Sequence, residues 1–206
     1  MIIHRTPAIL PMLYPQLVWR KAAGAKKLYL TFDDGPIPEL TPWVLDALAA
    51  YEVKATFFCV GDNVRKHPDI FTAIKAQGHA LGNHTYHHVK GWNMSGPQYV
   101  REVQQCDEVM QLRQREGKVL FRPPYGRIKR KQIAQLKADY EIVMWDVLTA
   151  DYDQRQRPED CLSKSLAVTR DGSIIVFHDN LKATRNLQYA LRPYIEECLA
   201  QGYTFD

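Results

Sequence analysis

Short apolar runs alternate with longer amphipathic segments along most of the 206-residue chain. The apolar runs have the length of strands, and the segments between them repeat their apolar positions at helical spacing. Strands that alternate with helices in this way predict parallel βαβ units. The predicted strands are 28–32, 55–60, 79–82, 119–121, 140–145, 173–177 and 203–205.

Helix signals separate these strands. Thr41-Pro42 offers an N-cap followed by a proline at the first helical position. Pro193 is expected to bend or split the last helix, because its ring interrupts the backbone hydrogen bonds of a helix. The predicted helices are 41–51, 68–77, 95–117 (the longest), 129–138, 158–169 and a last one that ends at Gly202.

Strands and helices in this order fit an open doubly wound sheet or an incomplete (β/α) barrel. Neither a G-x-G-x-x-G turn nor a Walker-type G-x-x-x-x-G-K is present, so the nucleotide-binding versions of these folds lose support. A chain of this length is most simply one domain. We expect a single α/β domain over 26–206, preceded by a Pro-rich arm over 1–25.

Composition and charge narrow the function classes. With 46% hydrophobic and 24% charged residues, the chain is typical of a globular protein. The net charge of +4 is only mildly basic and does not indicate nucleic-acid binding. The densest basic patch, 127–131, is either a solvated helix start or a means of steering anionic substrates toward a nearby site. The four cysteines form no C-x-x-C pair, which predicts reduced, packed thiols.

The sequence contains no signal for a membrane span or for export. No stretch approaches the roughly 18 apolar residues that a span needs. Pro7, Pro11 and Pro15 interrupt the apolar N-terminus, and no A-x-A-like cleavage site precedes the first strand. We therefore expect a cytoplasmic protein without a signal peptide. The sequence leaves the oligomeric state open.

Two adjacent aspartates, Asp33 and Asp34, end the first predicted strand just before Gly35-Pro36. An Asx turn would explain them without any function. Neighbouring like charges are costly, however, unless a cation offsets them. One aspartate could therefore bind a metal ion while the other works as a base.

A histidine cluster follows the third predicted strand. His84 and His88 are four residues apart, so one helical turn would bring both imidazoles onto one face. Two imidazoles and a carboxylate suit a first-row metal such as zinc and leave a position for water. His87 is a rival ligand that spacing alone does not exclude. A zincin motif is absent, because Thr85 stands where H-E-x-x-H needs its glutamate.

Three more polar clusters follow strand ends. Arg122 opens a stiff Arg-Pro-Pro-Tyr-Gly turn, and an arginine beside a carboxylate lowers the pKa of that carboxylate and fixes its orientation. Another strand end combines Trp145 and Tyr152 with Asp151, a mixture that suits sugar binding. His178 ends a buried strand, where an imidazole could act as general acid. Because the carboxyl ends of parallel strands share one face, we expect all five clusters to converge on one site.

The successive motifs resemble those of the NodB-type polysaccharide deacetylases, carbohydrate esterase family 4. They span 31–178, which is most of the chain. The resemblance implies a distorted (β/α) TIM-like barrel and the metal-dependent removal of an N- or O-acetyl group from a carbohydrate. The matching segments are Thr31-Phe32-Asp33-Asp34-Gly35, His84-Thr85-x-x-His88, Arg122-Pro-Pro-Tyr125-Gly126 and Val176-Phe177-His178.

The resemblance also implies residue roles. Asp34, His84 and His88 would hold one divalent cation, most simply zinc, with cobalt, manganese and nickel as alternatives. Asp33, oriented by Arg122, would take a proton from the attacking water.

The remaining roles concern the leaving group and the substrate. His178 would protonate the departing amine, and a backbone N–H near Tyr125 would stabilise the oxyanion. Trp145, Asp151 and Tyr152 are expected to contact the carbohydrate.

The fourth motif departs from the family pattern. Relatives often read D-x-x-D-W, and Leu148 replaces the first aspartate. The resemblance gives that aspartate the task of tuning the histidine acid, so a lower pKa or a looser orientation is expected for His178. Asp146 or Asp179 is the expected substitute.

Three functions fit the sequence. The leading one is a metal-dependent carbohydrate deacetylase, and no nucleic-acid partner is expected. A second is a deacylase, deformylase or amidohydrolase that acts on a small intracellular molecule. A third, of a different class, is a glycan-binding protein that keeps the metal site but has lost turnover.

Overall fold

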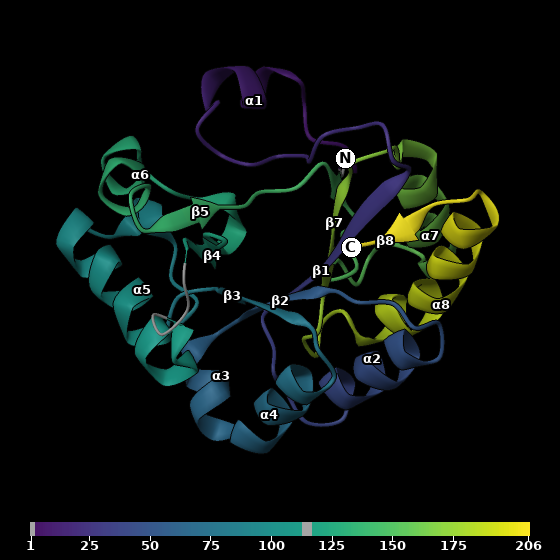
Figure 1. Ribbon diagram of the computed structural model, residues 1–206, viewed down its shortest axis with the longest axis horizontal. Coiled ribbons are helices and arrows are strands. Elements are labelled where there is room, and N and C mark those ends of the chain that lie inside the picture. Colours follow the sequence, from purple (N-terminus) through teal and green to yellow (C-terminus); the bar gives the residue numbers. More distant parts are fainter. Residues whose placement is uncertain (1–2, 113–116) are drawn as a thin grey trace.

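The computed structural model describes residues 3–112 and 117–206, which form a curled sheet with helices around its outer side (Figure 1). The strands are β1 (Lys27–Asp33), β2 (Thr56–Cys59), β3 (Ala80–Asn83), β4 (Val119–Phe121), β5 (Tyr140–Ile142), β6 (Val147–Leu148), β7 (Ile174–His178) and β8 (Thr204–Phe205). The α-helices are α1 (Ile9–Leu13), α2 (Leu40–Ala49), α3 (Gly61–Lys66), α4 (Pro68–Ala76), α5 (Gly96–Met110), α6 (Arg130–Leu136), α7 (Pro158–Val168) and α8 (Thr184–Ala200). Two short 3₁₀ helices are η1 (Gly91–Asn93) and η3 (Pro124–Gly126).

Parallel pairing aligns the carboxyl ends of the strands. Their order is β5-β4-β3-β2-β1-β7-β6, and β8 pairs with the start of β1. Asp33 in β1 lies level with Phe58 in β2 and with His178 in β7. Asn83 in β3 lies level with Phe121 in β4. Side chains that follow these strand ends therefore meet along one edge of the sheet.

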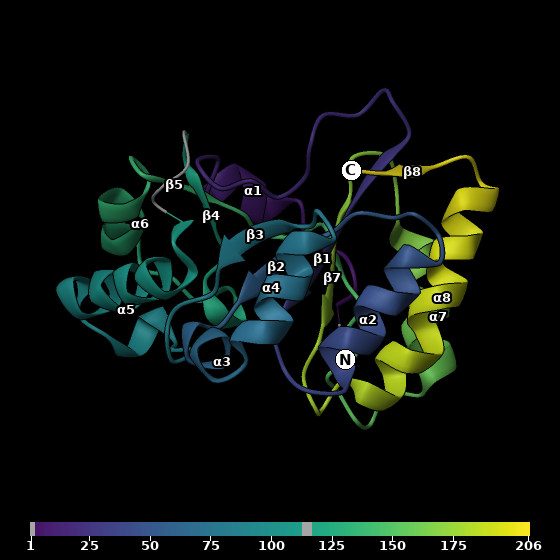
Figure 2. The ribbon, with the colours of Figure 1, turned by 60° about the horizontal axis from the view of Figure 1, so that its bottom comes forward.

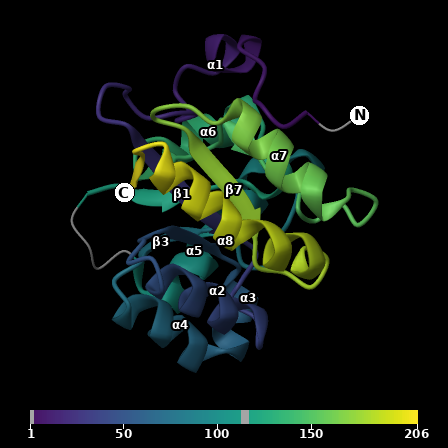
Figure 3. The ribbon, with the colours of Figure 1, turned by 90° about the vertical axis from the view of Figure 1, so that its right-hand side faces the viewer.

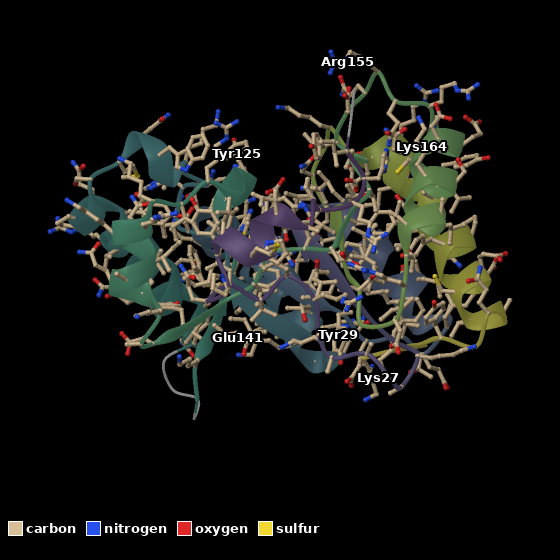
Figure 4. All side chains as sticks on the ribbon, turned by 90° about the horizontal axis from the view of Figure 1, so that it is seen from above. Lys27, Tyr29, Tyr125, Glu141, Arg155 and Lys164 are labelled. Carbon is tan, nitrogen blue, oxygen red and sulfur yellow. The ribbon has the colours of Figure 1, made fainter. Side chains whose placement is uncertain are left out.

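The labelled side chains in Figure 4 mark the two ends of the sheet. Tyr125 follows β4 and Arg155 follows β6, and both lie along the same edge of the molecule. Lys27 and Tyr29, at the start of β1, lie along the opposite edge. The predicted convergence of the polar clusters therefore has its physical basis in the parallel sheet.

Alternating side chains of the central strands serve the two faces of the sheet. Leu30 and Phe32 are fully buried toward the helices, where Phe32 stacks between Phe57 of β2 and Phe177 of β7 at centroid distances of 5.1 and 6.1 Å. Thr31 points to the other face, inside the curl. The helices that cover the outer face lie around the sheet in Figure 2. The apolar row fixes the register, because a slip by one residue would turn it inward.

The N-terminal arm crosses the open side of the curl. Val18 accepts a backbone hydrogen bond from Met144 (2.7 Å) and donates one to Ile142 of β5 (2.9 Å). Leu148 of β6 donates to the carbonyl of His4 (2.8 Å). The arm therefore joins β5 to β6, and Figure 3 shows its helix α1 on the side of the molecule away from α2, α3 and α4.

The predicted single α/β domain with a distorted TIM-like barrel of about seven strands is confirmed, with one change in the strands. The predicted strand 140–145 is shorter in the structure, where β5 ends at Ile142, and β6 (Val147–Leu148) lies beyond the predicted range. Residues between them pair with the arm: Val143 bridges to Val18, and the Asp146 carbonyl accepts a hydrogen bond from the Thr6 N–H (2.9 Å). This long-range pairing is not visible in a hydrophobic pattern.

The helices differ from the prediction in three respects. First, α1 and α3 were not predicted. Second, α8, with 17 residues, continues through Pro193 and is longer than α5, with 15. The carbonyl that loses its donor belongs to Tyr189, which is 45% exposed and accessible to water. Third, α5 ends at Met110, where Gln111 adopts a left-handed conformation, and residues 113–116 of the expected extension lie outside the described residues.

Two predictions from composition can be compared with the structure. All four cysteines are buried and none forms a disulfide, as expected. Among the described residues, no helix combines the length and the apolar character required to cross a membrane.

Candidate active site

The two aspartates at the end of β1 point to different partners. Asp33 is the last residue of the strand, and its Oδ1 accepts a hydrogen bond of 2.7 Å from Arg122. Asp34 has a φ of 88°, which turns the chain out of the strand. Its Oδ1 lies 3.0 Å from Nε2 of His88 and 3.4 Å from Nε2 of His84. Adjacent carboxylates thus occupy separate environments.

A pinned loop, not a helical turn, brings the two histidines together. The Asn83 side chain anchors the end of β3 to α5 by donating to the carbonyl of Val103 (2.7 Å), and its oxygen accepts from the Thr85 N–H (2.8 Å). Residues 84–88 contain no helix, and the rings of His84 and His88 lie 5.1 Å apart. The predicted proximity of the two imidazoles is therefore confirmed, but the expected helical geometry is wrong.

Arg122 is the only fully buried arginine among the described residues, and its contacts fix Asp33. Its guanidinium donates to Asp33, to the Thr31 hydroxyl (2.7 Å) and to the carbonyls of Val143 (3.2 Å) and Met144 (2.8 Å). The guanidinium also lies 4.1 Å from the ring centroid of Phe58. Burial lowers the pKa of Arg122, and the Asp33 charge opposes that effect. Arg122 cannot move without losing several bonds, so Asp33 Oδ1 is held in place and Oδ2 faces the histidines.

Asp34, His84 and His88 form a potential metal centre, with one ligand atom from each within 4.8 Å of the others. Nδ1 of His84 lies 2.7 Å from the carbonyl of Arg122 and must donate to it, so its Nε2 carries a lone pair. Asp34 Oδ1 is buried and has no hydrogen-bond donor in the described part of the chain. When both imidazoles are neutral, their lone pairs and the Asp34 carboxylate can face a cation in place of a proton.

The charge state of Asp34 is consistent with this assignment. Burial alone would raise the pKa of Asp34, but the facing imidazoles of His84 and His88 outweigh it and hold the pKa well below its usual range. His87 does not join the group. Its ring is exposed and pairs with Glu102 (2.9 Å), so the rival ligand set is wrong.

Four of the nine non-glycine residues with positive φ in the described part of the chain lie at this site. Asp34, Thr85, His88 and Tyr125 all have positive φ, at 88°, 64°, 55° and 60°. Each such non-glycine residue costs of the order of 1–3 kcal/mol, and the surrounding contacts must hold it. Strain of this kind is common where side chains are positioned for a function.

The acid side of the site is built on β7 and the loop after β6. His178 ends β7, and Asp151 accepts hydrogen bonds from its backbone N–H (2.7 Å) and from its Nδ1 (2.8 Å). Burial lowers the pKa of His178, but the Asp151 carboxylate outweighs it and raises the pKa to about 9. A protonated imidazole with Nδ1 occupied can offer only its Nε2 proton to a bound molecule.

This arrangement corrects the expectation drawn from Leu148. His178 has a raised pKa and a fixed orientation, because Asp151 supplies the carboxylate. Asp146 pairs with Arg170 (2.8 Å) at the start of β7, and Asp179 binds the Gly35 N–H (2.9 Å) and the Thr41 hydroxyl. Neither is the substitute for the missing aspartate.

The Asp179 carboxyl is a separate structural feature. It is buried, and burial raises its pKa to about 7 despite its two hydrogen bonds. A Cβ on Gly35 would lie 1.9 Å from an Asp179 oxygen, so only glycine fits directly after the two aspartates.

The residues expected to contact substrate separate into two groups. Tyr125 is 54% exposed, and its ring lies 4.7 Å from that of His88. Tyr152 is 39% exposed and meets the His178 ring edge-on at 4.9 Å. Trp145 is half-buried, and its ring packs against Gly126. Asp151 is fully buried, so its carboxylate orients the histidine and is not available to a carbohydrate.

Sequence reasoning missed two asparagines that hold Asp34. The side chain of Asn180 donates to Asp34 Oδ2, and that of Asn63 donates to its backbone carbonyl (2.8 Å). The position of Asn180, two residues after a strand-end histidine, was a signal for it. No local pattern marks Asn63, which lies in the unpredicted helix α3.

The fold and the site define an α/β half-barrel with a potential metal centre at the carboxyl ends of its strands. The family model of the polysaccharide deacetylases matches residues 20–143. The chain belongs to this family.

Three relatives illustrate the match. A peptidoglycan-N-acetylglucosamine deacetylase of Bacillus cereus is 35% identical over 150 residues, which are 72% of this chain and 54% of that protein. A chitooligosaccharide deacetylase of Sinorhizobium fredii is 35% identical over 168 residues, or 81% and 78% of the two chains. The crystal structure of the peptidoglycan N-acetylglucosamine deacetylase Bc1960 has a TM-score of 0.86 at 30% identity and covers 98% of this chain and 94% of its own. The chain therefore spans about half of the first relative and most of the other two.

Proposed function

We propose that the protein hydrolyses the N-acetyl group of a carbohydrate, releasing acetate and leaving a free amine. The observation that carries the proposal is the arrangement of a three-residue cation site, an arginine-held aspartate and an aspartate-held histidine along one edge of the sheet. The activities printed in the names of the relatives support the same reaction.

A divalent cation fits the site of Asp34, His84 and His88, and we propose zinc, with cobalt, manganese and nickel as alternatives. Such a cation supplies Lewis-acid polarisation of a carbonyl and a lowered pKa for water. The chain fixes the donor atoms beforehand: Arg122 orients the ring of His84, and Asn180 and Asn63 hold Asp34.

Asp33 is the proposed base. Its Oδ1 is bound to Arg122, while its Oδ2 lies 3.9 Å from Nε2 of His84 and faces the cation site. A water molecule that attacks the acetamide carbon loses its proton to this oxygen. The backbone N–H of Tyr125, which has no acceptor among the described residues, is the proposed donor to the developing oxyanion.

His178 is the proposed acid. Since Asp151 occupies Nδ1, the proton at Nε2 goes to the amine nitrogen as the carbon–nitrogen bond breaks. The carboxylate of Asp151 keeps the imidazole protonated at neutral pH. Tyr152, edge-on to the same ring, limits its rotation.

Acetate release from N-acetylated oligosaccharides, measured after loading with each of the four metals, tests the proposal. The expected result is turnover that depends on added metal and is lost in His84→Ala, with His87→Ala as the matched control because His87 lies outside the ligand group. Sugar binding without acetate release under every metal would contradict the proposal and favour a glycan-binding role. Release of a different acyl group from small amides would favour the small-molecule alternative.

A further inference from the structure

Two cationic side chains lie beside the site, each over the face of an aromatic ring. The proposed hydrolysis uses neither of them. Lys90 Nζ lies 4.6 Å from the ring centroid of Tyr125. Arg127 Cζ lies 4.5 Å from the ring of Trp92. Both aromatic residues are 54% exposed, so these cation–ring pairs are accessible from solvent. Contacts of this kind limit where an otherwise mobile side chain carries its charge.

The Lys90–Tyr125 pair lies next to the proposed metal centre. The Tyr125 ring lies 4.7 Å from the ring of His88, one of the proposed ligands. The Tyr125 ring therefore contacts both His88 and the Lys90 ammonium. A glycan whose reacting acetamide sits at the cation site would place a neighbouring sugar near these charges.

Close backbone contacts bring the two cation–ring pairs together. A Cβ on Gly91 would lie 2.6 Å from the carbonyl oxygen of Arg127, so the two segments touch. The indole N–H of Trp92 donates to the carbonyl of Ile128 (3.3 Å), and the Gln132 side chain donates to that of Gly91 (2.9 Å). Residues 90–92 and 125–128 therefore form one unit of the rim.

Neither Lys90 nor Arg127 has a carboxylate partner within residues 3–112 and 117–206. Other arginines do have one: Arg65 of α3 pairs with Asp62 (2.8 Å), and Arg155, in the loop after β6, pairs with Asp153 (2.9 Å). Two unpaired cations near a binding site attract and select an anionic ligand.

We propose that Lys90 and Arg127 form a subsite for a carboxylate-bearing sugar next to the N-acetylated residue that reacts. The protein then acts on an acidic N-acetylated glycan in preference to a neutral one. A guanidinium matches a carboxylate in two parallel hydrogen bonds, and the ammonium adds a second charge. A neutral sugar gains less binding free energy, because the two cations occupy the aromatic ring faces on which the sugar would stack. This inference rests on the proposed function and names its substrate class.

Substrates that differ only in the carboxylate test the subsite. Peptide-free glycan strands of peptidoglycan, whose alternate sugars carry a carboxylate, are compared with the same strands after reduction of the carboxyl groups to alcohols. The expected kcat/KM for acetate release is about tenfold higher for the acidic strands, the equivalent of one charge-assisted hydrogen bond. The preference should shrink as salt is raised, since exposed charges are screened.

Paired variants locate the effect. Lys90→Gln with Arg127→Gln is expected to lower the acidic-to-reduced ratio to near one. Lys75→Gln with Arg192→Gln removes the same two charges from cation–ring pairs on α4 and α8, at 5.7 and 5.9 Å from their rings, and should keep the wild-type ratio.

Separate outcomes overturn the two proposals. A wild-type ratio of one, or a Lys90/Arg127 variant with the wild-type ratio, overturns the subsite. Absence of acetate from every substrate overturns the proposed function instead. In that case calorimetric binding of the acidic and reduced strands still tests the subsite, because equal affinities would contradict it.

Discussion

The two halves of the site hold their proton-transfer groups with opposite charges. In the half formed by β1 and β4, a buried cation, Arg122, holds the anion Asp33. In the half formed by β6 and β7, a buried anion, Asp151, holds the imidazole of His178. In both halves, the buried counter-charge binds the atom that is turned away from the cation site: Oδ1 of Asp33 in one and Nδ1 of His178 in the other. One design, a counter-charge behind the working group, thus serves the proposed base in one half and the proposed acid in the other.

The halves differ in how firmly they are anchored. Arg122 also donates hydrogen bonds to the Thr31 hydroxyl and to two backbone carbonyls. Asp151 binds both the ring and the backbone N–H of His178 and makes two further bonds: its Oδ1 accepts from the Tyr152 N–H (3.1 Å) and its carbonyl accepts from Asn186 (2.9 Å). The base half also carries the cation site, so changes there should have larger effects.

The largest effect is expected from removing the cation or its ligands. A chelator, or Asp34→Asn together with His84→Ala, should abolish acetate release, a loss greater than the roughly 10²–10⁴-fold that one proton-transfer group contributes. Activity of the chelated wild type should return with added metal, and that of the variant should not. Full activity of the double variant would place the reaction elsewhere.

The next effect separates the base from the cation site. Asp33→Asn should lower kcat by roughly 10²–10⁴-fold, because the amide cannot accept the proton. Metal content, measured by elemental analysis, should stay at the wild-type level, since Asp33 is not in the ligand group. Loss of the metal would show that the two aspartates do not have separate tasks.

A smaller, pH-dependent effect is expected in the acid half. His178 must be protonated to act, and Asp151 raises its pKa to about 9, so wild-type activity should decline as pH rises through about 9. Asp151→Asn removes the largest raising charge, while burial still lowers the pKa and Asp34 and Asp33 still raise it, so the decline should move toward the ordinary imidazole pKa of about 6.5. At pH 8.5 the variant should lose roughly two orders of magnitude in kcat/KM.

Asp153→Asn is the matched control for this shift, because it removes a carboxylate from the same loop that pairs with Arg155. Its pH profile should follow the wild type. If the activity of Asp151→Asn declined at the same alkaline pH as that of the wild type, the assignment of His178 as the acid would be contradicted.

The smallest effect is expected at Tyr152. Tyr152→Phe keeps the edge-on ring contact with His178 and should change kcat by less than about twofold. Tyr152→Ala removes a contact worth about 0.5–1.5 kcal/mol and should lower kcat by roughly two- to tenfold. A large loss in Tyr152→Phe would instead give the hydroxyl a task of its own.

The sequence predicted the base half better than the acid half, for a physical reason. Asp33 ends a strand that its apolar run reveals, and Asp34, His84 and Arg122 directly follow such strands. Parallel pairing then brings these residues together. Asp151 follows β6, a strand of only two residues with no detectable period. Its meeting with His178 depends on the tertiary pairing of this short strand with β7.

The same limit explains other differences. β6 is short because the chain before it pairs with the arm, a contact between residues more than 120 positions apart. Pro193 is tolerated in α8 because the carbonyl it leaves without a donor lies at the surface, which a local helix rule does not know. The positive φ of Thr85 and His88 likewise replaced a helical turn that the spacing alone suggested.

The position of the arm has a consequence for how chains meet one another. β5 and β6 are the outermost strands of the curl, and outermost strands recruit further chains through their unpaired backbone groups. Val18 forms backbone hydrogen bonds along the outer edge of β5, and His4 accepts one from β6. The N-terminal arm thus covers both edges of the sheet. A shortened chain that starts at residue 26 would expose the edges of β5 and β6 to edge-to-edge aggregation.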